Sequence, residues 1–237
     1  MVKVFKQLIS SIFLVSFSSC ASYWGVPKEI KQNFTFCYNG KITGIDSLIN
    51  IDGFFEIAET FKKPVYDNGS MLNKKQYLVI DTSYQNLLFF KDGIFLFGFF
   101  DINEDRHKSG IRQSNLSLLF KEIGQDSIGK MANSFYKWFK WGVYTIDGDT
   151  IKAQWINHPE FLSPYWYAYE VWYKVIDRNT IIEIYSKPLH YMSESDWKIY
   201  YEAKKHEKKK LPAKFISIEV LPNSNCWLKK ERWFLCE

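Results

Sequence analysis

Residues 141–155, WGVYTIDGDTIKAQW, constrain the fold more than any other stretch of the chain. Apolar and polar residues alternate on both sides of an Asp-Gly step, a strong hairpin signal because glycine accepts the positive φ of a tight turn. With Asp147 and Gly148 as the loop residues, Tyr144 is expected opposite Ile151. One face then carries Tyr144, Ile146, Ile151, Ala153 and Trp155, and the other carries Val143, Thr145, Lys152 and Gln154. One apolar and one more polar face predict an antiparallel sheet that packs on one side.

A second hairpin is expected at 86–100, NLLFFKDGIFLFGFF, where both faces are apolar. A two-residue loop at Asp92-Gly93 puts Leu88, Phe90, Phe95 and Phe97 on one face, and Leu87, Phe89, Ile94, Leu96 and Phe100 on the other. Both faces must be covered, because the hairpin would otherwise expose a large apolar patch. We expect the cover to be a helix at about 113–122, because Leu116, Leu119, Phe120 and Ile123 recur at helical spacing.

A third hairpin is expected at 166–185, with a turn at Asp177 to Thr180 that would set Lys174 opposite Glu183 as a cross-strand ion pair. Shorter strands are expected at 34–38, 53–61, 76–81, 214–220 and 226–236, and a short helix at 193–205. The aromatic content of 19% suits a pleated sheet. Eight to ten strands in sequential hairpins predict a mainly β fold, an up-and-down antiparallel barrel without free edges. A two-sheet sandwich is the alternative.

The N-terminal residues have the pattern of a targeting segment, and we do not expect them to be part of the fold. Lys3 and Lys6 precede ten residues, 8–17, that are apolar but too few to span a bilayer. Ser18 and Ser19 then lead directly to Cys20. Small residues before a cysteine resemble the lipobox of bacterial lipoproteins, which implies cleavage before Cys20 and a diacylglycerol on its thiol. A secretory signal followed by an incidental cysteine is the alternative.

We therefore expect a signal peptide at 1–19, a lipid-anchored tether at 20–33 and a single barrel-like domain at 34–237. The lipobox, the series of hairpins and the run WGVYTIDGDTI at 141–151 together resemble lipocalin-like (calycin-type) barrels of envelope lipoproteins. The resemblance implies the cell envelope of a Gram-negative bacterium, with the protein anchored to a membrane, most simply the outer one. It also implies a barrel that takes a hydrophobic small molecule.

The charge balance is weakly basic. Removal of Lys3 and Lys6 from the 31 basic residues leaves 29 against 26 acidic ones, a net charge of +3. This balance does not indicate nucleic-acid binding. The one basic concentration is KKHEKKK at 204–210, a solvated run or a contact for anionic headgroups.

Three cysteines follow Cys20, namely Cys37, Cys226 and Cys236. The compartment beyond the inner membrane permits disulfides, and an odd count allows at most one bond. We expect Cys226 and Cys236 to form it, because they lie ten residues apart and could join a terminal hairpin. Pairing of Cys37 with either of them remains open.

Catalytic and metal motifs are weak throughout the chain. Asp101, Asn103 and Asp105 imitate the start of a calcium loop, but Arg106 and Arg112 stand where that loop needs glycine and glutamate. The four histidines lie far apart, and neither a nucleophile elbow nor a phosphate loop is present. The sequence therefore predicts neither an enzyme nor a metal or other cofactor.

Two functions remain. In the first, the protein binds a hydrophobic small molecule inside the barrel, where small barrels of this strand number hold one ligand. The expected lining residues are Tyr144, Ile151, Trp155, Tyr169 and Trp172. In the second, the barrel is filled by side chains and the protein is a structural or adaptor lipoprotein that binds an envelope protein.

Overall fold

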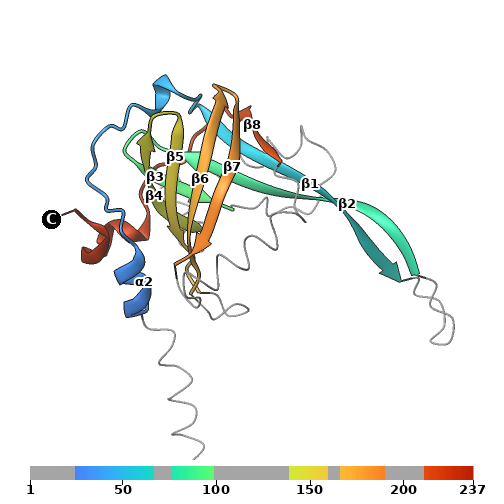
Figure 1. The fold of residues 1–237 in the computed structure, drawn as a ribbon, viewed down its shortest axis with the longest axis horizontal. Helices are drawn as coiled ribbons and strands as arrows, with labels where there is room; N and C mark the ends of the chain where they lie inside the picture. The colour runs from blue at the N-terminus through green and yellow to red at the C-terminus, as the bar shows by residue number, and fades with distance from the viewer. Residues whose placement is uncertain (1–24, 67–75, 99–138, 160–165, 190–210, 237) are drawn as a thin grey trace, which may run out of the picture.

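The computed structural model describes residues 25–66, 76–98, 139–159, 166–189 and 211–236. Within them, eight antiparallel strands follow one another around a closed barrel, and the last returns to pair with the first (Figure 1). The strands are β1 (Gly53–Tyr66), β2 (Gln76–Phe89), β3 (Ile94–Phe97), β4 (Lys140–Asp147), β5 (Thr150–Ile156), β6 (Ala168–Asp177), β7 (Thr180–Pro188) and β8 (Pro212–Ser217). The predicted mainly β, up-and-down barrel is confirmed, and the closed sheet excludes the sandwich.

The described part of the chain adds one short helix and three 3-10 turns. They are α2 (Lys28–Asn33), η2 (Ile45–Ser47), η3 (Trp227–Lys230) and η4 (Arg232–Phe234). The helices expected at 113–122 and 193–205, the calcium-like loop at 101–107 and the basic run at 204–210 lie outside the described residues.

The hairpin of β4 and β5 has the predicted faces but a different turn. Asp147 pairs with Thr150 and Tyr144 pairs with Ala153, so Gly148 and Asp149 form the loop, and Gly148 has a φ of +60°. The shift from the expected register changes each partner by two residues, and side chains therefore keep their faces. Contacts with β6 place this turn, since the Asp149 carbonyl accepts a hydrogen bond from the Val175 N–H at 2.8 Å and its carboxylate pairs with Lys174.

In the hairpin of β2 and β3, the predicted faces are wrong by one residue. Phe90 N–H donates to the Ile94 carbonyl at 2.9 Å, which leaves a three-residue loop at 91–93 with Gly93 at φ +90°. A three-residue loop that ends on a left-handed residue is a common hairpin connection. Its register turns Phe89 and Phe95 into the barrel and sends Phe90 outward, because a slip of one residue reverses every side chain.

The third hairpin turns at Arg178 and Asn179 as expected, but its predicted ion pair is wrong. A bulge between Val175 and Asp177 shifts the register, so Lys174 lies opposite Ile182 rather than Glu183. An extra residue in one strand displaces all later partners. Lys174 instead pairs with Asp149 of the neighbouring turn.

The two ends of the barrel differ. We call the end that carries the three tight turns at 91–93, 148–149 and 178–179 the turn end, and the opposite end, where β3 leads toward β4 and β5 toward β6, the loop end (Figure 1). Ile45 of η2 and Ile49, which follows it, close the turn end, and both are fully buried. Arg178 holds η2 in place by donating to the carbonyls of Asp46 at 3.0 Å and Ser47 at 3.3 Å.

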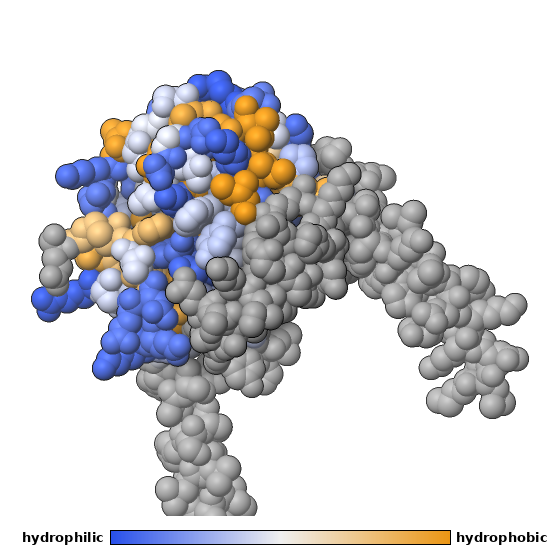
Figure 2. All heavy atoms as spheres, viewed as in Figure 1, coloured by the Kyte–Doolittle hydropathy of each residue, from blue (hydrophilic) through white to orange (hydrophobic). Residues whose placement is uncertain are grey.

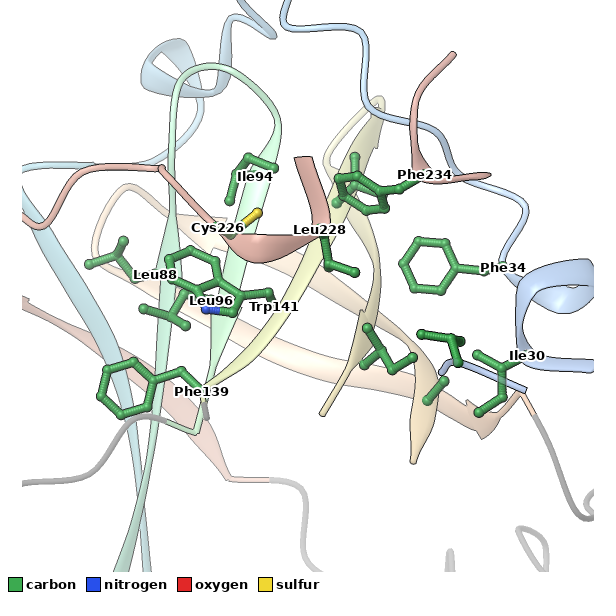
Figure 3. Close-up of a cluster of buried hydrophobic side chains, with 14 of the residues drawn as sticks. Ile30, Phe34, Leu88, Ile94, Leu96, Phe139, Trp141, Cys226, Leu228 and Phe234 are labelled. Carbon is green, nitrogen blue, oxygen red and sulfur yellow. The ribbon is translucent and has the colours of Figure 1, made fainter. Parts of the chain in front are cut away.

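A second core lies on the outside of the barrel wall. Leu88, Leu96 and Trp141 point outward there, and the two ends of the described chain cover them (Figure 3). The cover comprises Ile30 and Phe34 from the N-terminal side and Cys226, Leu228 and Phe234 from the C-terminal side. The expectation that the 86–100 hairpin is covered on both faces is confirmed for its described part, and the described cover comes from the two chain ends.

The strands predicted at 34–38 and 226–236 are wrong. Their only sheet contact in the described structure is one bridge between Tyr38 and Leu235, and 3-10 turns occupy much of the second stretch. These aromatic segments pack their rings against the barrel wall instead of joining the sheet. Phe34, for example, contacts Trp233 and Phe234 at centroid distances of 5.5 and 5.8 Å.

Two sequence assignments change at the chain ends. Cys37 is bonded to Cys236, while Cys226 is a free thiol in the outer core. The predicted Cys226–Cys236 bond is therefore wrong, and the alternative with Cys37 is correct. The physical reason is that residues 226–236 form no hairpin, so nothing brings Cys226 to Cys236. In addition, residues expected to be tether form α2, whose Ile30 is buried.

The first two strands are longer than predicted. Among the strands that the structure describes, β1 and β2 pair only with each other beyond Ile57 and Gln85, because β8 reaches no farther than Glu56 and β3 no farther than Leu87. They leave the barrel as a two-stranded ribbon, visible on the right of Figure 1.

Candidate functional site

Aromatic rings fill the turn-end half of the barrel interior. Phe89 lies at the centre of this group and contacts Phe55, Tyr144 and Tyr173 edge-on at 6.2, 5.5 and 6.1 Å. Phe55, Phe95, Tyr144 and Tyr173 are all among the largest fully buried side chains. Edge-to-face contacts at these distances are favourable, so this half is a packed core.

Toward the loop end, three rings form a stack across the interior wall. Trp155 on β5 lies between Phe97 on β3 and Tyr169 on β6, with centroid distances of 4.7 and 4.9 Å and nearly parallel planes. The Lys140 ammonium lies over this stack, 5.1 Å from the Phe97 centroid and 5.3 Å from that of Trp155. Phe97 and Tyr169 are only half-buried, so the stack borders the loop end.

Two polar groups inside this apolar interior have no partner in the described part of the chain. They are the indole N–H of Trp155 and the hydroxyl of Tyr173. A buried donor without an acceptor costs about 1–3 kcal/mol and is uncommon in native proteins. Trp155 and Tyr173 stand four residues apart in register, because Trp155 pairs with Tyr169. The interior therefore offers hydrogen bonds at two depths that no atom of the described ranges takes up.

The structure brings four of the five predicted lining residues together. Tyr144, Ile151 and Trp155 are buried inside the barrel, and Tyr169 packs beside them. Trp172 is a correction, because it faces outward, where its ring contacts Tyr185 at 4.8 Å and its indole N–H donates to Glu170 at 2.7 Å. Trp172 lies one residue from Tyr173, and neighbouring residues of a strand point to opposite faces.

Tyr144 has a structural role as well as an interior position. Its hydroxyl donates to the Phe90 carbonyl at 2.6 Å and shares a hydrogen bond with Thr43 at 2.7 Å. Burial raises the pKa of Tyr144 far above its ordinary value. The hydroxyl is thus neutral and already paired, which leaves Trp155 as the predicted lining residue with an unused donor.

Sequence reasoning missed Phe97 and Lys140 as neighbours of Trp155. The sequence pattern placed Phe97 correctly on the face of Phe95. Because the loop was one residue too short, however, it placed Leu88 on that face instead of Phe89. Lys140 opens β4 one residue before the stretch chosen at 141. The signal available in the sequence was Lys140, a basic residue directly before the alternating run that contains Trp141 and Tyr144.

A separate hollow of about 240 Å³ lies at the turn end, bordered among others by Cys37, Tyr38, Thr43, Asp92 and Tyr144. Its carboxylate, Asp92, accepts hydrogen bonds from Tyr38 at 3.0 Å, Ser224 at 2.8 Å and Lys229 at 2.9 Å. These bonds join both chain ends to the β2–β3 turn. We therefore treat Asp92 as a structural junction and assign the hollow no ligand.

The Asp92 junction should make stability depend on pH. Burial alone raises the pKa of Asp92. The hydrogen bonds from Lys229, Ser224 and Tyr38 and the positive charge of Lys229 outweigh this effect and lower the pKa below its ordinary value. A carboxyl whose pKa falls on folding contributes stability above its unfolded pKa and loses it as pH falls through the folded pKa. We expect Asp92→Asn to lower the free energy of unfolding at neutral pH by about 1–2 kcal/mol.

Urea unfolding of the parent and of Asp92→Asn checks this result at neutral and acidic pH. The difference between the two proteins should shrink in acid. Asp147→Asn is the matched control, because Asp147 is 71% exposed in its pair with Lys152 and should matter by less than about 1 kcal/mol. A difference that stays constant with pH would contradict the ionic role of Asp92.

Within the described ranges, no three histidine, cysteine or acidic side chains are placed to hold a metal ion. No helix of the described chain has the length and hydropathy needed to cross a bilayer. Among the residues that Figure 2 colours, most are hydrophilic, with one group of apolar residues between them. Comparisons of the chain with protein-family models, with curated proteins and with solved structures find no match.

Proposed function

We propose that this protein binds a mostly apolar small molecule that carries a hydrogen-bond acceptor, at the loop end of the barrel. The observation that carries the proposal is the buried Trp155 N–H, which has no acceptor among the described residues although it belongs to an aromatic stack at the border of the interior. An acceptor on the ligand would remove the cost of this unpaired donor. The apolar part would lie on Phe97 and Tyr169.

The turn end is unsuited to entry of a ligand. Ile45 and Ile49 of the η2 segment close it, and Phe89 with its neighbouring rings fills the space below. The architecture supports the same function, because an eight-stranded meander barrel is wide enough to hold one small ligand, as in lipocalins. The ligand therefore occupies the loop-end part of the interior.

The role of Trp155 is tested by titration with a fluorescent fatty acid. We expect Trp155→Phe to weaken binding about tenfold, since it keeps an apolar ring but loses one hydrogen bond worth roughly 1–1.5 kcal/mol. Trp172→Phe is the matched control, because this tryptophan lies outside the barrel and should leave the affinity unchanged. Energy transfer from tryptophan to the probe measures both affinities.

The same titration decides in favour of the second function if the parent protein binds no probe. The packed turn-end half favours that adaptor role, in which the whole interior is core and the outer surface binds an envelope protein. In that case Trp155→Phe should change only stability.

We further propose that Cys20 is acylated and anchors the protein to a membrane of a Gram-negative envelope. Two or three acyl chains give stable anchoring, since each buried CH₂ contributes about 0.8 kcal/mol. We expect the protein to partition into detergent and to incorporate labelled fatty acid, and Cys20→Ala to abolish both. An unmutated protein that stays in the aqueous phase would contradict the anchor and favour a secretory signal with an incidental cysteine.

A further inference from the structure

The start of the described chain is fixed at the loop end of the barrel. Val26 and Ile30 are buried in the outer core, together with Ile156, Ala168 and Leu189 from the loop-end parts of the wall. The Asn33 side-chain amide donates to the Leu189 carbonyl at 2.7 Å, directly after β7. α2 therefore lies beside the loop end, as Figure 1 shows.

The length of chain between Cys20 and this fixed point is short. Val26 follows Cys20 by six positions, with five residues between them. At full extension this stretch spans about 20 Å, whatever conformation it adopts. β6, with ten residues, continues for about 30 Å from the loop end to the turn end. An acyl group on Cys20 therefore keeps the loop end, and not the turn end, close to the membrane.

The surface around α2 suits contact with anionic headgroups. Lys28 on α2 is exposed, as are Lys230 and Arg232 in the C-terminal segment. This segment adjoins α2, because Trp233 contacts Phe34, the residue directly after the helix, at 5.5 Å. Figure 2 shows hydrophilic residues over α2. Each basic side chain near an anionic leaflet contributes about 1 kcal/mol of attraction.

We infer that the loop end of the barrel faces the bilayer and that the ligand is an acyl lipid that enters directly from the membrane. This inference rests on the proposed function and on acylation of Cys20, and adds the orientation and the source of the ligand. The stack of Phe97, Trp155 and Tyr169 lies at the end that meets the lipid, whereas the end closed by η2 faces away.

Orientation is tested without any ligand. The acylated protein is placed in vesicles of phosphatidylethanolamine and phosphatidylglycerol that carry spin-labelled headgroups. A fluorophore is attached at Glu29→Cys, an exposed position of α2, or at Ile176→Cys, which is 60% exposed near the turn at 178–179. We expect loss of emission for the label at residue 29 and unchanged emission at residue 176. Equal quenching at both, or quenching at residue 176 alone, would overturn the orientation.

Direct entry is tested by lengthening the tether. Twenty glycine and serine residues inserted between Ala21 and Ser22 should slow transfer of a fluorescent fatty acid from the vesicle to the barrel about tenfold, because effective concentration falls steeply with linker length. The same insert after Glu237 is the matched control and should leave the rate unchanged. Equal rates for both inserts would overturn direct entry. Absence of binding by the detergent-solubilised parent would instead refute the proposed function.

Discussion

Removal of the Cys37–Cys236 disulfide is expected to lower the free energy of unfolding by about 4 kcal/mol, because the bond closes a very long loop in the unfolded chain. The two cysteines are 199 residues apart, and their bond joins the segments that cover the outer core. Without the bond, no covalent link holds the segments of Phe34 and Phe234 together. Urea unfolding of the Cys37→Ala/Cys236→Ala variant measures the effect.

Reductant supplies the control for this prediction. Dithiothreitol should destabilise the parent protein to the same extent and leave the double variant unchanged. Thiol counting adds an independent check, since Cys226 should be the one free thiol among Cys37, Cys226 and Cys236. Burial raises the pKa of the Cys226 thiol to about 11, so it should react only after unfolding. Two reactive thiols besides Cys226 in the oxidised protein would contradict the bond.

Gly142→Ala is expected to destabilise the protein by about 3 kcal/mol or more, an extreme case of overpacking. A Cβ at this position of β4 would lie 1.9 Å from the Gln154 carbonyl oxygen and 2.7 Å from the Trp155 Cα. Both are backbone atoms of β5, so no side-chain rotation relieves the overlap. The strands would have to separate beside Trp155, the centre of the proposed site.

Gly25→Ala is the matched control, because an added Cβ there meets no atom within 4 Å. It should leave the free energy of unfolding nearly unchanged. Gly53→Ala should behave like Gly142→Ala, since its Cβ would lie 2.0 Å from the Ile216 carbonyl oxygen of β8. Thermal unfolding followed by circular dichroism compares the three variants. A Gly142→Ala protein as stable as the parent would show that β4 and β5 do not approach as described.

The sequence alone predicted the sheet and its closure, because these depend on local signals. Alternation placed Tyr144, Ile151 and Trp155 on one buried face, and that prediction holds although the turn moved by one residue. The face tolerates this change, since side chains alternate with a period of two and each partner moved by two. By contrast, a single additional loop residue at Lys91 reversed the predicted faces of β2 against β3.

Registers and covers depended on contacts far apart in the chain. The bulge before Asp177 arises where β6 pairs with β7, and Lys174 of β6 pairs with Asp149 of the β4–β5 turn; neither is displayed by any single stretch of sequence. The aromatic runs near Phe34 and Phe234 look like strands locally. They instead cover the outer wall. This cover buries the outward-facing side chains of Leu88 and Leu96, whereas the closed sheet has no free edge for a further strand.

The residues of the candidate site also fall into those that the sequence predicted and those that required the tertiary structure. Sequence alternation was sufficient to select Trp155 and Tyr169, but Trp172 required the register, which sets it on the outer face. Composition and periodicity thus determined the fold class, the strand order and most of the interior. Only the tertiary structure decided which cysteines meet, which end of the barrel is closed and which interior donor has no partner among the described residues, because each depends on segments that come together only when the barrel closes.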